Sequence, residues 1–239
     1  MKRLFALSLL TLFLTCLVFP ASSLAQEDKI KIDRSRIPAV AANVKDFIPP
    51  GWKLEEQVTG DLNGDALPDY ALKLVEDKPA KDKDDAATER QRALVIVLQN
   101  KDGKLSRAAV TDSLLQCTRC GGAFYGVVEA PASVTIEKGV LIVEQDHGSR
   151  EISDLTYRFR YEPQTQKFAL IGFEYRYHDR LTAGVKTEST NHLTGVRETF
   201  RSKGKRDLKS RRTIPRQKIY IEQVDNEKFE EDASKRLGA

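Results

Sequence analysis

Residues 155–161, Leu-Thr-Tyr-Arg-Phe-Arg-Tyr, alternate strictly between large apolar and polar side chains. Because successive side chains of a strand point to opposite faces of a sheet, this alternation puts the leucine and the three aromatic rings on one face. One buried face and one polar face are typical of an antiparallel strand at the surface of a core. Residues 168–177 follow after a turn as the partner strand. Their apolar phase changes near Gly172, which predicts a β-bulge there.

Further hairpins follow from the same kind of pattern. Residues 92–98 are apolar and β-branched, which indicates a central strand buried on both faces. Two short apolar runs flank Lys138-Gly139, and residues 182–200 suggest another hairpin with its turn at Thr194-Gly195. The sequence therefore predicts an all-β fold of antiparallel hairpins in a single domain, either a sandwich or a propeller-like stack of small sheets.

The segments around these strands have weaker signals. Residues 38–47 combine a Pro at a first helical position with apolar residues at helical spacing, so we expect one short N-terminal helix. Residues 76–90 are mostly charged or small and predict an exposed flexible loop. Residues 201–218 predict a basic loop, 219–224 a last strand, and 225–239 a polar tail that is weakly helical or frayed.

The N-terminus has the pattern of a cleaved export signal. Lys2 and Arg3 precede an apolar run at 4–19, and Ser23-Leu-Ala25 fits the small-x-small rule of signal peptidase. We therefore expect a signal peptide at 1–25 and a secreted or periplasmic protein. The apolar run is short for a membrane anchor, and no later segment is apolar enough to span a bilayer. We expect no transmembrane helix after cleavage.

The exported part divides into a flexible segment at 26–37, a β-rich domain at 38–224 and the polar tail. The whole chain has 39 Lys and Arg against 35 Asp and Glu, and this near balance gives no argument for a nucleic-acid partner. The basic segment 201–218 would suit an anionic envelope component. Another secreted protein is the alternative kind of partner.

An acidic loop is the sharpest chemical signal in the chain. Oxygen-bearing side chains stand at offsets 1, 3, 5 and 9 of the loop, and the backbone carbonyl of Leu67 stands at offset 7; the side chains are those of Asp61, Asn63, Asp65 and Asp69. Calcium takes about six to eight oxygen ligands, and EF-hand loops use the same offsets over their first nine positions. We therefore expect a structural Ca²⁺ site. A metal-free turn, in which the carboxylates accept hydrogen bonds from backbone N–H groups, is the alternative.

This loop, D-x-N-x-D-x-x-x-D between two strands, resembles the calcium loop of FG-GAP and VCBS-type proteins. That resemblance implies that Asp61, Asn63, Asp65 and Asp69 are side-chain ligands and that Leu67 gives its carbonyl. The family has Gly after the third ligand, whereas this chain has Ala66. A positive φ at Ala66 would cost on the order of 1 kcal/mol. Three further stretches, at 47–52, 117–122 and 190–195, resemble a group of uncharacterised secreted bacterial proteins with a single such loop.

Cys117-Thr-Arg-Cys120 is the other notable motif. Two cysteines in an exported chain favour a structural disulfide. A redox centre would need the first cysteine at a helix N-terminus within a βαβ unit. A zinc site would need two more ligands, for which His147, His178 and His192 are the available histidines.

No catalytic motif stands out, so we name no catalytic residue. Residues 146–149 contain triad residue types, but adjacent residues on a hairpin cannot form a nucleophile–base–orienter line. Arg158, Arg160 and Arg176 would share a polar sheet face as cross-strand neighbours. We therefore expect a secreted or periplasmic non-catalytic β domain with one structural calcium loop, acting in cell-envelope binding or assembly. An envelope hydrolase with an unrecognised site and a thiol–disulfide protein using Cys117 and Cys120 are the alternatives.

Overall fold

The structure is a computed structural model that describes residues 30–79, 88–123, 125, 129–203 and 206–238. The predicted signal peptide at 1–25 lies outside the described residues. Within the described ranges, no helix is both long enough and apolar enough to cross a membrane.

The strands form two antiparallel sheets. The order in the five-stranded sheet is β1 (Val40–Ala41), β5 (Leu105–Thr111), β4 (Arg92–Gln99), β3 (Asp69–Glu76) and β2 (Trp52–Gly60). The order in the seven-stranded sheet is β12 (Arg206–Thr213), β11 (Val196–Lys203), β10 (Gly184–Asn191), β9 (Lys167–Asp179), β8 (Glu151–Glu162), β7 (Val140–Gly148) and β6 (Ala132–Glu137). The three predicted hairpins are confirmed as β6–β7, β8–β9 and β10–β11.

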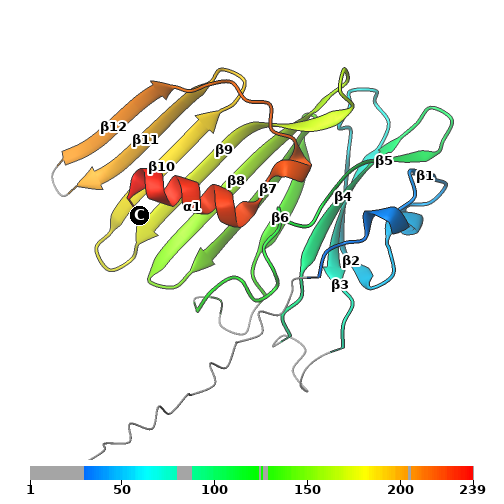
Figure 1. Ribbon diagram of the computed structural model, residues 1–239, viewed down its shortest axis with the longest axis horizontal. Coiled ribbons are helices and arrows are strands. Elements are labelled where there is room, and N and C mark those ends of the chain that lie inside the picture. Colours follow the sequence, from blue (N-terminus) through cyan, green and yellow to red (C-terminus); the bar gives the residue numbers. More distant parts are fainter. Residues whose placement is uncertain (1–29, 80–87, 124, 126–128, 204–205, 239) are drawn as a thin grey trace, which may run out of the picture.

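The two sheets pack as a sandwich, so the all-β prediction is confirmed. Leu94 and Ile96 of β4 share one core with Tyr157 and Phe159 of β8. The face of the seven-stranded sheet that packs on the five-stranded sheet also carries a C-terminal helix, α1 (Asn226–Leu237). The helix lies beside the five-stranded sheet (Figure 1). The single α-helix of the described chain is thus at the C-terminus and not at the predicted N-terminal position.

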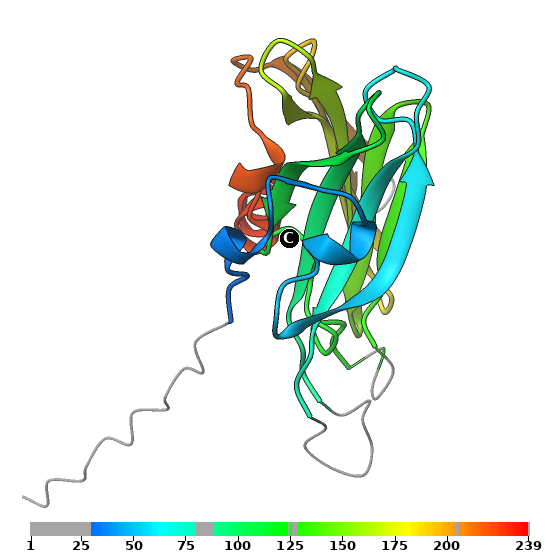
Figure 2. The same ribbon diagram turned by 90° about the vertical axis from the view of Figure 1, so that its right-hand side faces the viewer.

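The N-terminal segment covers the other face of the five-stranded sheet, as the blue ribbon in Figure 2 shows. Ile32 and Ile37 are buried in a second core, together with Phe47, Trp52 and Leu72. The prediction of a flexible segment at 26–37 is therefore wrong for its described part, because these two isoleucines pack against a sheet that is apolar on both faces.

The predicted N-terminal helix is also wrong. Val40 and Ala41 form β1 at the edge of the sheet, where Val40 pairs with Ser106. Val44–Phe47 form a single 3₁₀ turn, η2. The free edge of β5 provides backbone partners for this segment, and that tertiary contact outweighs the weak helical pattern.

Three further predictions are corrected at the ends of the strands. The basic segment 201–218 is not a loop, because Arg206–Thr213 form the edge strand β12. The predicted last strand at 219–224 is one bridge at Tyr220 and a 3₁₀ turn, η4 (Ile221–Gln223). The loop at 76–90 is exposed only in part at its described ends, because the side chains of Glu76, Thr88 and Arg90 are buried there.

The polar tail is a well-formed helix. Asp225 caps it by accepting a hydrogen bond from the N–H of Lys228 at 3.1 Å, and Gly238 ends it in the left-handed conformation. Ala233 and Leu237 are buried in the main core, against which Phe229 packs. These three residues are four apart, so they share one face of the helix.

The bulge predicted near Gly172 is confirmed. Gly172 faces Arg158, and the next pair in the register is Leu170 with Phe159. The extra residue lets both Leu170 and Phe173 point into the core, because it shifts the side-chain alternation by one position.

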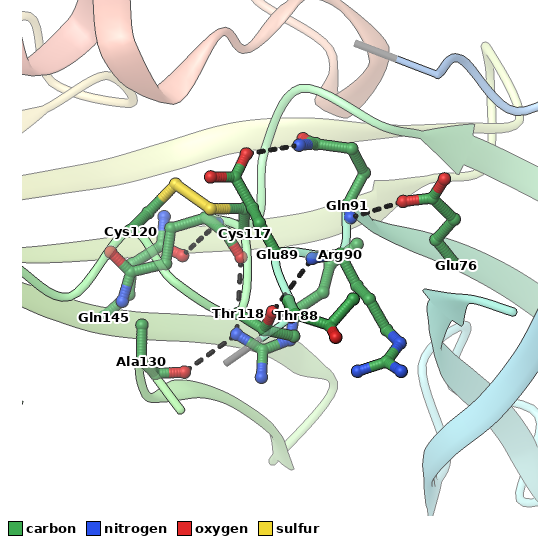
Figure 3. The surroundings of a disulfide bond; sticks show 12 residues. Glu76, Thr88, Glu89, Arg90, Gln91, Cys117, Thr118, Cys120, Ala130 and Gln145 are labelled. Carbon is green, nitrogen blue, oxygen red and sulfur yellow. Dashed lines mark hydrogen bonds between the residues drawn. A yellow bond between two sulfur atoms is a disulfide. The ribbon is translucent and has the colours of Figure 1, made fainter. Parts of the chain in front are cut away.

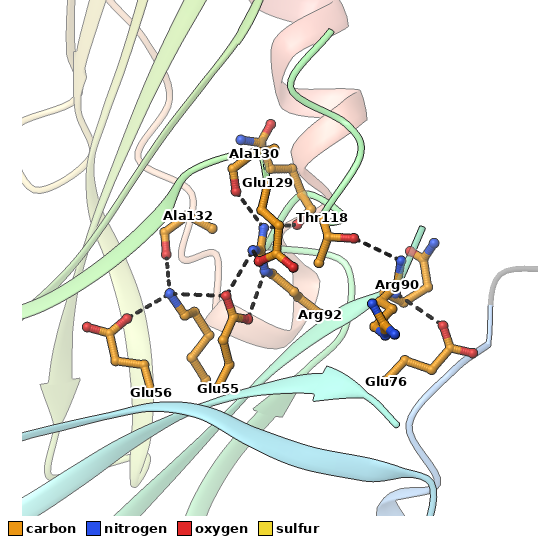
Figure 4. Close-up of polar contacts among 12 residues, drawn as sticks. Glu55, Glu56, Glu76, Arg90, Arg92, Thr118, Glu129, Ala130 and Ala132 are labelled. Carbon is orange, nitrogen blue, oxygen red and sulfur yellow. Dashed lines mark hydrogen bonds and ion pairs between the residues drawn. The ribbon is translucent and has the colours of Figure 1, made fainter. Parts of the chain in front are cut away.

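A buried ion cluster joins the two sheets next to their edges (Figure 4). A second bulge, in β2 between Leu54 and Glu56, turns both Glu55 and Glu56 toward the space between the sheets. Arg92 donates two hydrogen bonds of 2.8 Å to Glu55 and another of 2.8 Å to the carbonyl of Ala130. Lys73 contacts Glu56 at 2.7 Å and donates to the carbonyl of Ala132, where β6 begins. The cluster therefore ties β2, β3 and β4 to the start of the second sheet.

We expect Arg92→Leu to lower the free energy of unfolding by about 3 kcal/mol, because it leaves Glu55 mostly buried without its guanidinium partner. Urea denaturation would measure the loss. Arg211→Leu is the matched control, since Arg211 makes a similar 3.0 Å pair with Glu198 in an exposed position and should cost less than about 1 kcal/mol. Equal losses in the two variants would contradict a structural role for the buried cluster.

Candidate functional site

The acidic loop forms the turn between β2 and β3. Asp61 follows the last residue of β2, and its two carboxylate oxygens accept hydrogen bonds from the N–H groups of Gly64 at 2.7 Å and Ala66 at 2.9 Å. Burial raises the pKa of Asp61, but these N–H donors outweigh it and bring the pKa below its ordinary value of 3.8. Asp61 therefore remains ionised at neutral pH.

The next two predicted ligands form consecutive Asx turns. Asn63 accepts from the N–H of Asp65 at 2.9 Å, and Asp65 accepts from the N–H of Leu67 at 2.9 Å. The amide of Asn63 also donates to the second oxygen of Asp65 at 3.2 Å. These contacts give the loop a fixed shape without any ion.

Asp69 anchors the loop to the sheet. Its side chain is fully buried, and its two oxygens accept hydrogen bonds from the N–H of Leu62 at 2.8 Å and the N–H of Gln99 at 2.9 Å. Burial raises the pKa of Asp69, and the charges of Asp65 and Asp61 raise it further, against the opposing effect of the two N–H groups. The raised pKa of Asp69 therefore reflects mainly its burial, and the neighbouring carboxylates contribute less.

The oxygen ligands of the loop suit a hard cation, although its carboxylates accept hydrogen bonds from backbone N–H groups in this structure. Asp61, Asp65 and Asp69 form no ion pair with a Lys or Arg of the described chain. Among the same residues, no group of three or more His, Cys, Asp and Glu could hold a metal ion. Every carboxylate oxygen that accepts one N–H still has a further lone pair, so cation binding would require rotation of these side chains and not a new fold.

The backbone of the loop has a positive φ at the position where FG-GAP and VCBS-type loops, which this loop resembles, have glycine. Ala66 has a φ of 66°, in the left-handed region where glycine is favoured. The positive φ strains the backbone by on the order of 1 kcal/mol, because Ala66 has a Cβ atom that glycine lacks.

Cys117 and Cys120 are joined in a disulfide, as the sequence predicts (Figure 3). They close a turn between β5 and β6, with the N–H of Cys120 donating to the carbonyl of Cys117 at 3.2 Å. Thr118 within this turn exchanges hydrogen bonds of 3.0 Å with Arg90 at the start of β4. The pair is not at a helix N-terminus, which is the context that a thioredoxin-like centre needs.

The turn then packs tightly on the end of β7. The N–H of Gly148 donates to the carbonyl of Gly121 at 2.9 Å, and a Cβ atom at Gly122 would come within 2.8 Å of the Gly148 carbonyl oxygen. Gly122 is required by this close backbone approach, whereas a Cβ atom at Gly121 would come within 2.7 Å of the Tyr125 ring. The disulfide fixes the turn that makes the approach possible.

A cavity of about 650 Å³ lies beside the disulfide and is lined by a charged pair that the sequence pattern does not predict. His147 Nε2 lies 2.8 Å from a carboxylate oxygen of Glu230, which comes from α1. The hydrogen bond to Glu230 raises the pKa of His147 above 6.5, against the effect of burial. Burial raises the pKa of Glu230, but His147 outweighs it and brings the value below 4.5. The two residues are 83 positions apart, so no local pattern could connect them.

The other sequence candidates do not form a site together. Asp146 accepts a hydrogen bond from the hydroxyl of Tyr125, while its neighbour His147 pairs with Glu230, so the triad residue types diverge. On the polar face of the seven-stranded sheet, Arg158 pairs with Glu174 at 3.0 Å across the strands. His178 and His192 provide no zinc site with the cysteines in the described ranges.

Comparison with known protein families finds no match for this chain, and a search among curated proteins finds no relative.

We expect Ala66→Gly to raise the free energy of unfolding by about 1 kcal/mol in the presence of chelator, because glycine removes the strain of the left-handed backbone. Urea denaturation would measure the gain. Ala108→Gly, in β5 and outside the positive-φ residues, is the control and should be destabilising. A loss of stability at both positions would show that Ala66 is not strained.

We expect Glu230→Gln to reduce stability by about 1–2 kcal/mol, with the largest effect between about pH 5 and 6. Since the pKa of Glu230 is lowered, its contribution is present above 4.5 and is lost as the pH falls. Since the pKa of His147 is raised, its contribution is present below 6.5 and is lost as the pH rises through the raised value. Urea denaturation of the parent protein and of Glu230→Gln at several pH values would measure how the difference in free energy of unfolding depends on pH. A difference that stays constant from pH 4 to pH 9 would contradict the ion pair.

Proposed function

We propose that this chain is an exported, non-catalytic β-sandwich domain whose acidic hairpin holds a structural calcium ion and which acts in cell-envelope binding or assembly. In this proposal the side chains of Asp61, Asn63, Asp65 and Asp69 and the carbonyl of Leu67 are the ligands. The ion would neutralise two of the three carboxylate charges of the loop and clamp the β2–β3 hairpin.

The observation that carries the proposal is the uncompensated charge of the hairpin. Three carboxylates lie within nine residues, one of them is fully buried, and none pairs with a basic side chain of the described chain. Clustered carboxylates of this kind repel one another, which costs stability until a cation binds. Carboxylate, amide and backbone carbonyl oxygens are the ligands that Ca²⁺ prefers.

Asp69 explains why the ion would matter to the whole domain. Its carboxylate connects the loop to β4 through the N–H of Gln99, so the loop and the central strand share one group. An ion that fixes Asp69 would therefore stabilise the end of β4 as well as the β2–β3 turn. The likeness of the loop to FG-GAP and VCBS-type calcium loops supports the same assignment, with Ala66 as the departure.

The compartment is supported by two features. The disulfide between Cys117 and Cys120 suits an oxidising environment, and the first 25 residues have the pattern of an export signal. The hydrolase and thiol–disulfide alternatives have less support in the 650 Å³ cavity. The two cysteines that line this cavity are joined in the disulfide, so neither is a free thiol. The hydroxyl of Ser113, which also lines the cavity, donates to the carbonyl of Val224 at 2.8 Å and not to a catalytic base.

We expect calcium to raise the melting temperature by about 5–10 °C over the value in chelator, when the ion is at about 100 times its dissociation constant. Differential scanning calorimetry on the chain without its signal segment would measure the shift, with Mg²⁺ as the ion control. Identical midpoints with calcium and with chelator would refute the site.

Matched variants separate ligand loss from loss of a turn. Asp65→Asn should abolish most of the calcium shift. Asp102→Asn should leave it intact, because Asp102 accepts the N–H of Lys104 at 3.0 Å in the β4–β5 turn, an Asx contact like that of Asp65 but outside the acidic loop.

A further inference from the structure

A second cavity lies on the seven-stranded sheet, at the end farthest from β6. It has a volume of about 420 Å³ and is lined by β10, β11, β12 and the last turn of α1. Figure 1 shows β11 and β12 extending past α1, so the inner face of these two strands is not covered by the helix. The basic segment that the sequence suggested as a mobile loop thus forms one wall of a defined cavity.

The strand register places arginines and hydroxyl groups on this one face. Residues directly opposite each other in an antiparallel pair point to the same side of the sheet. Arg197 faces Arg212, and Thr199 faces Ser210 in the next pair on that side. Arg201 faces Leu208 one step further along. On this face the hydroxyls of Thr199 and Ser210 therefore lie between the Arg197–Arg212 pair on one side and Arg201 on the other.

The buried charges of the cavity do not cancel. Glu188 is the one acid that lines it, and its side chain is fully buried. Arg236 donates two hydrogen bonds of 2.7 Å to Glu188, and Arg197 lies 3.3 Å from the same carboxylate. Two guanidinium groups thus share one carboxylate.

The other two arginines add to this excess. Arg201 donates to the carbonyl of Arg236 at the end of α1, which neutralises no charge. Arg212 is exposed and has no acidic partner in the described part of the chain. Burial lowers the pKa of Arg197, and the charge of Arg236 lowers it further, against the opposing effect of Glu188. An added anion would relieve this repulsion.

We propose that the cavity binds a ligand through a phosphate or sulfate group, with Arg197, Arg201 and Arg212 as the contacting cations. A doubly charged tetrahedral group accepts hydrogen bonds on three or more oxygens, so it uses guanidinium groups on both sides and the hydroxyls of Thr199 and Ser210 between them. Arginine is suited to this role because its planar fork matches such oxyanions. Leu208 and Ile214 line the same cavity, and they would contact a less polar part of the ligand.

This site does not depend on the acidic loop, which belongs to the other sheet. Isothermal titration calorimetry at low salt, with inorganic phosphate and pyrophosphate as probes, would detect it in the chain without its signal segment. We expect saturable binding that weakens as NaCl is added, because the contacts are charged. Absence of saturable binding for both probes would overturn the proposal, whatever the effect of calcium on stability.

Two neighbouring arginines of β12 give a matched test. Arg212→Gln should weaken pyrophosphate binding about 10-fold or more, the usual consequence of losing a charge-assisted hydrogen bond. Arg211→Gln removes the same charge from the opposite face of the strand, where Arg211 pairs with Glu198, and should change binding less than about twofold by screening alone. Both are exposed, so both variants should keep the melting temperature of the parent. Equal weakening by the two variants would overturn the assignment to the cavity.

A second arm identifies the source of the phosphate group. Phosphatidylcholine vesicles that contain phosphatidic acid present a terminal phosphate monoester on a lipid surface, and vesicles of phosphatidylcholine alone are the control. Binding to phosphatidic acid that is lost in Arg212→Gln would indicate a lipid headgroup. Binding of pyrophosphate without vesicle binding would indicate a soluble phosphorylated ligand. Vesicle binding that Arg212→Gln leaves unchanged would show that another surface is responsible and would count against the cavity.

Discussion

The aromatic inner face of β8 and β9 is the surface on which the rest of the molecule is assembled. Tyr157 lies at its centre, 5.1 Å from Phe173 and 5.9 Å from Phe229 of α1 between ring centroids. The Tyr157 hydroxyl donates to the side chain of Asn226 at 2.9 Å, so the buried ring also satisfies its polar atom at the first residue of the helix. The inner face of the five-stranded sheet and the apolar stripe of the helix both pack against this face and share one core with it.

The sequence predicted that face and could not predict its partners. Strict alternation at 155–161 is a local property, and a local rule is sufficient to read it. The choice of what covers each face depends on contacts between distant parts of the chain. Ile32 and Ile37 stand alone among charged residues, and only an apolar outer face on the five-stranded sheet gives them a place to pack. The helix was missed for a similar reason, since Phe229, Ala233 and Leu237 are a thin apolar stripe in a polar segment.

Charge was the property that sequence patterns described least well. The run at 201–218 predicted a basic loop, yet four of its cations lie on the edge strand β12, where charged side chains discourage pairing with another chain. Arg92 and Lys73 lie inside apparently apolar strands, and the bulge that turns Glu55 and Glu56 toward them cannot be inferred from residue types. For the acidic loop, by contrast, spacing alone located the turn and its Asx contacts, because all its partners except Gln99 are within eight residues.

The two sheets differ in the sign of their unbalanced charge. At one hairpin of the five-stranded sheet, three carboxylates have no basic partner among the residues that the structure describes, and the seven-stranded sheet has arginines in excess of acids at its far edge. Both excesses lie at the periphery of a sheet and not in the core. Repulsion between like charges lowers the free energy of unfolding, and a bound ion of opposite charge would raise it again. The two charge excesses are therefore the places where a bound ion would stabilise the fold most. The apolar core between them fixes the shape of the domain, and the proposed calcium ion and phosphate-bearing ligand would each relieve one of these two charge excesses.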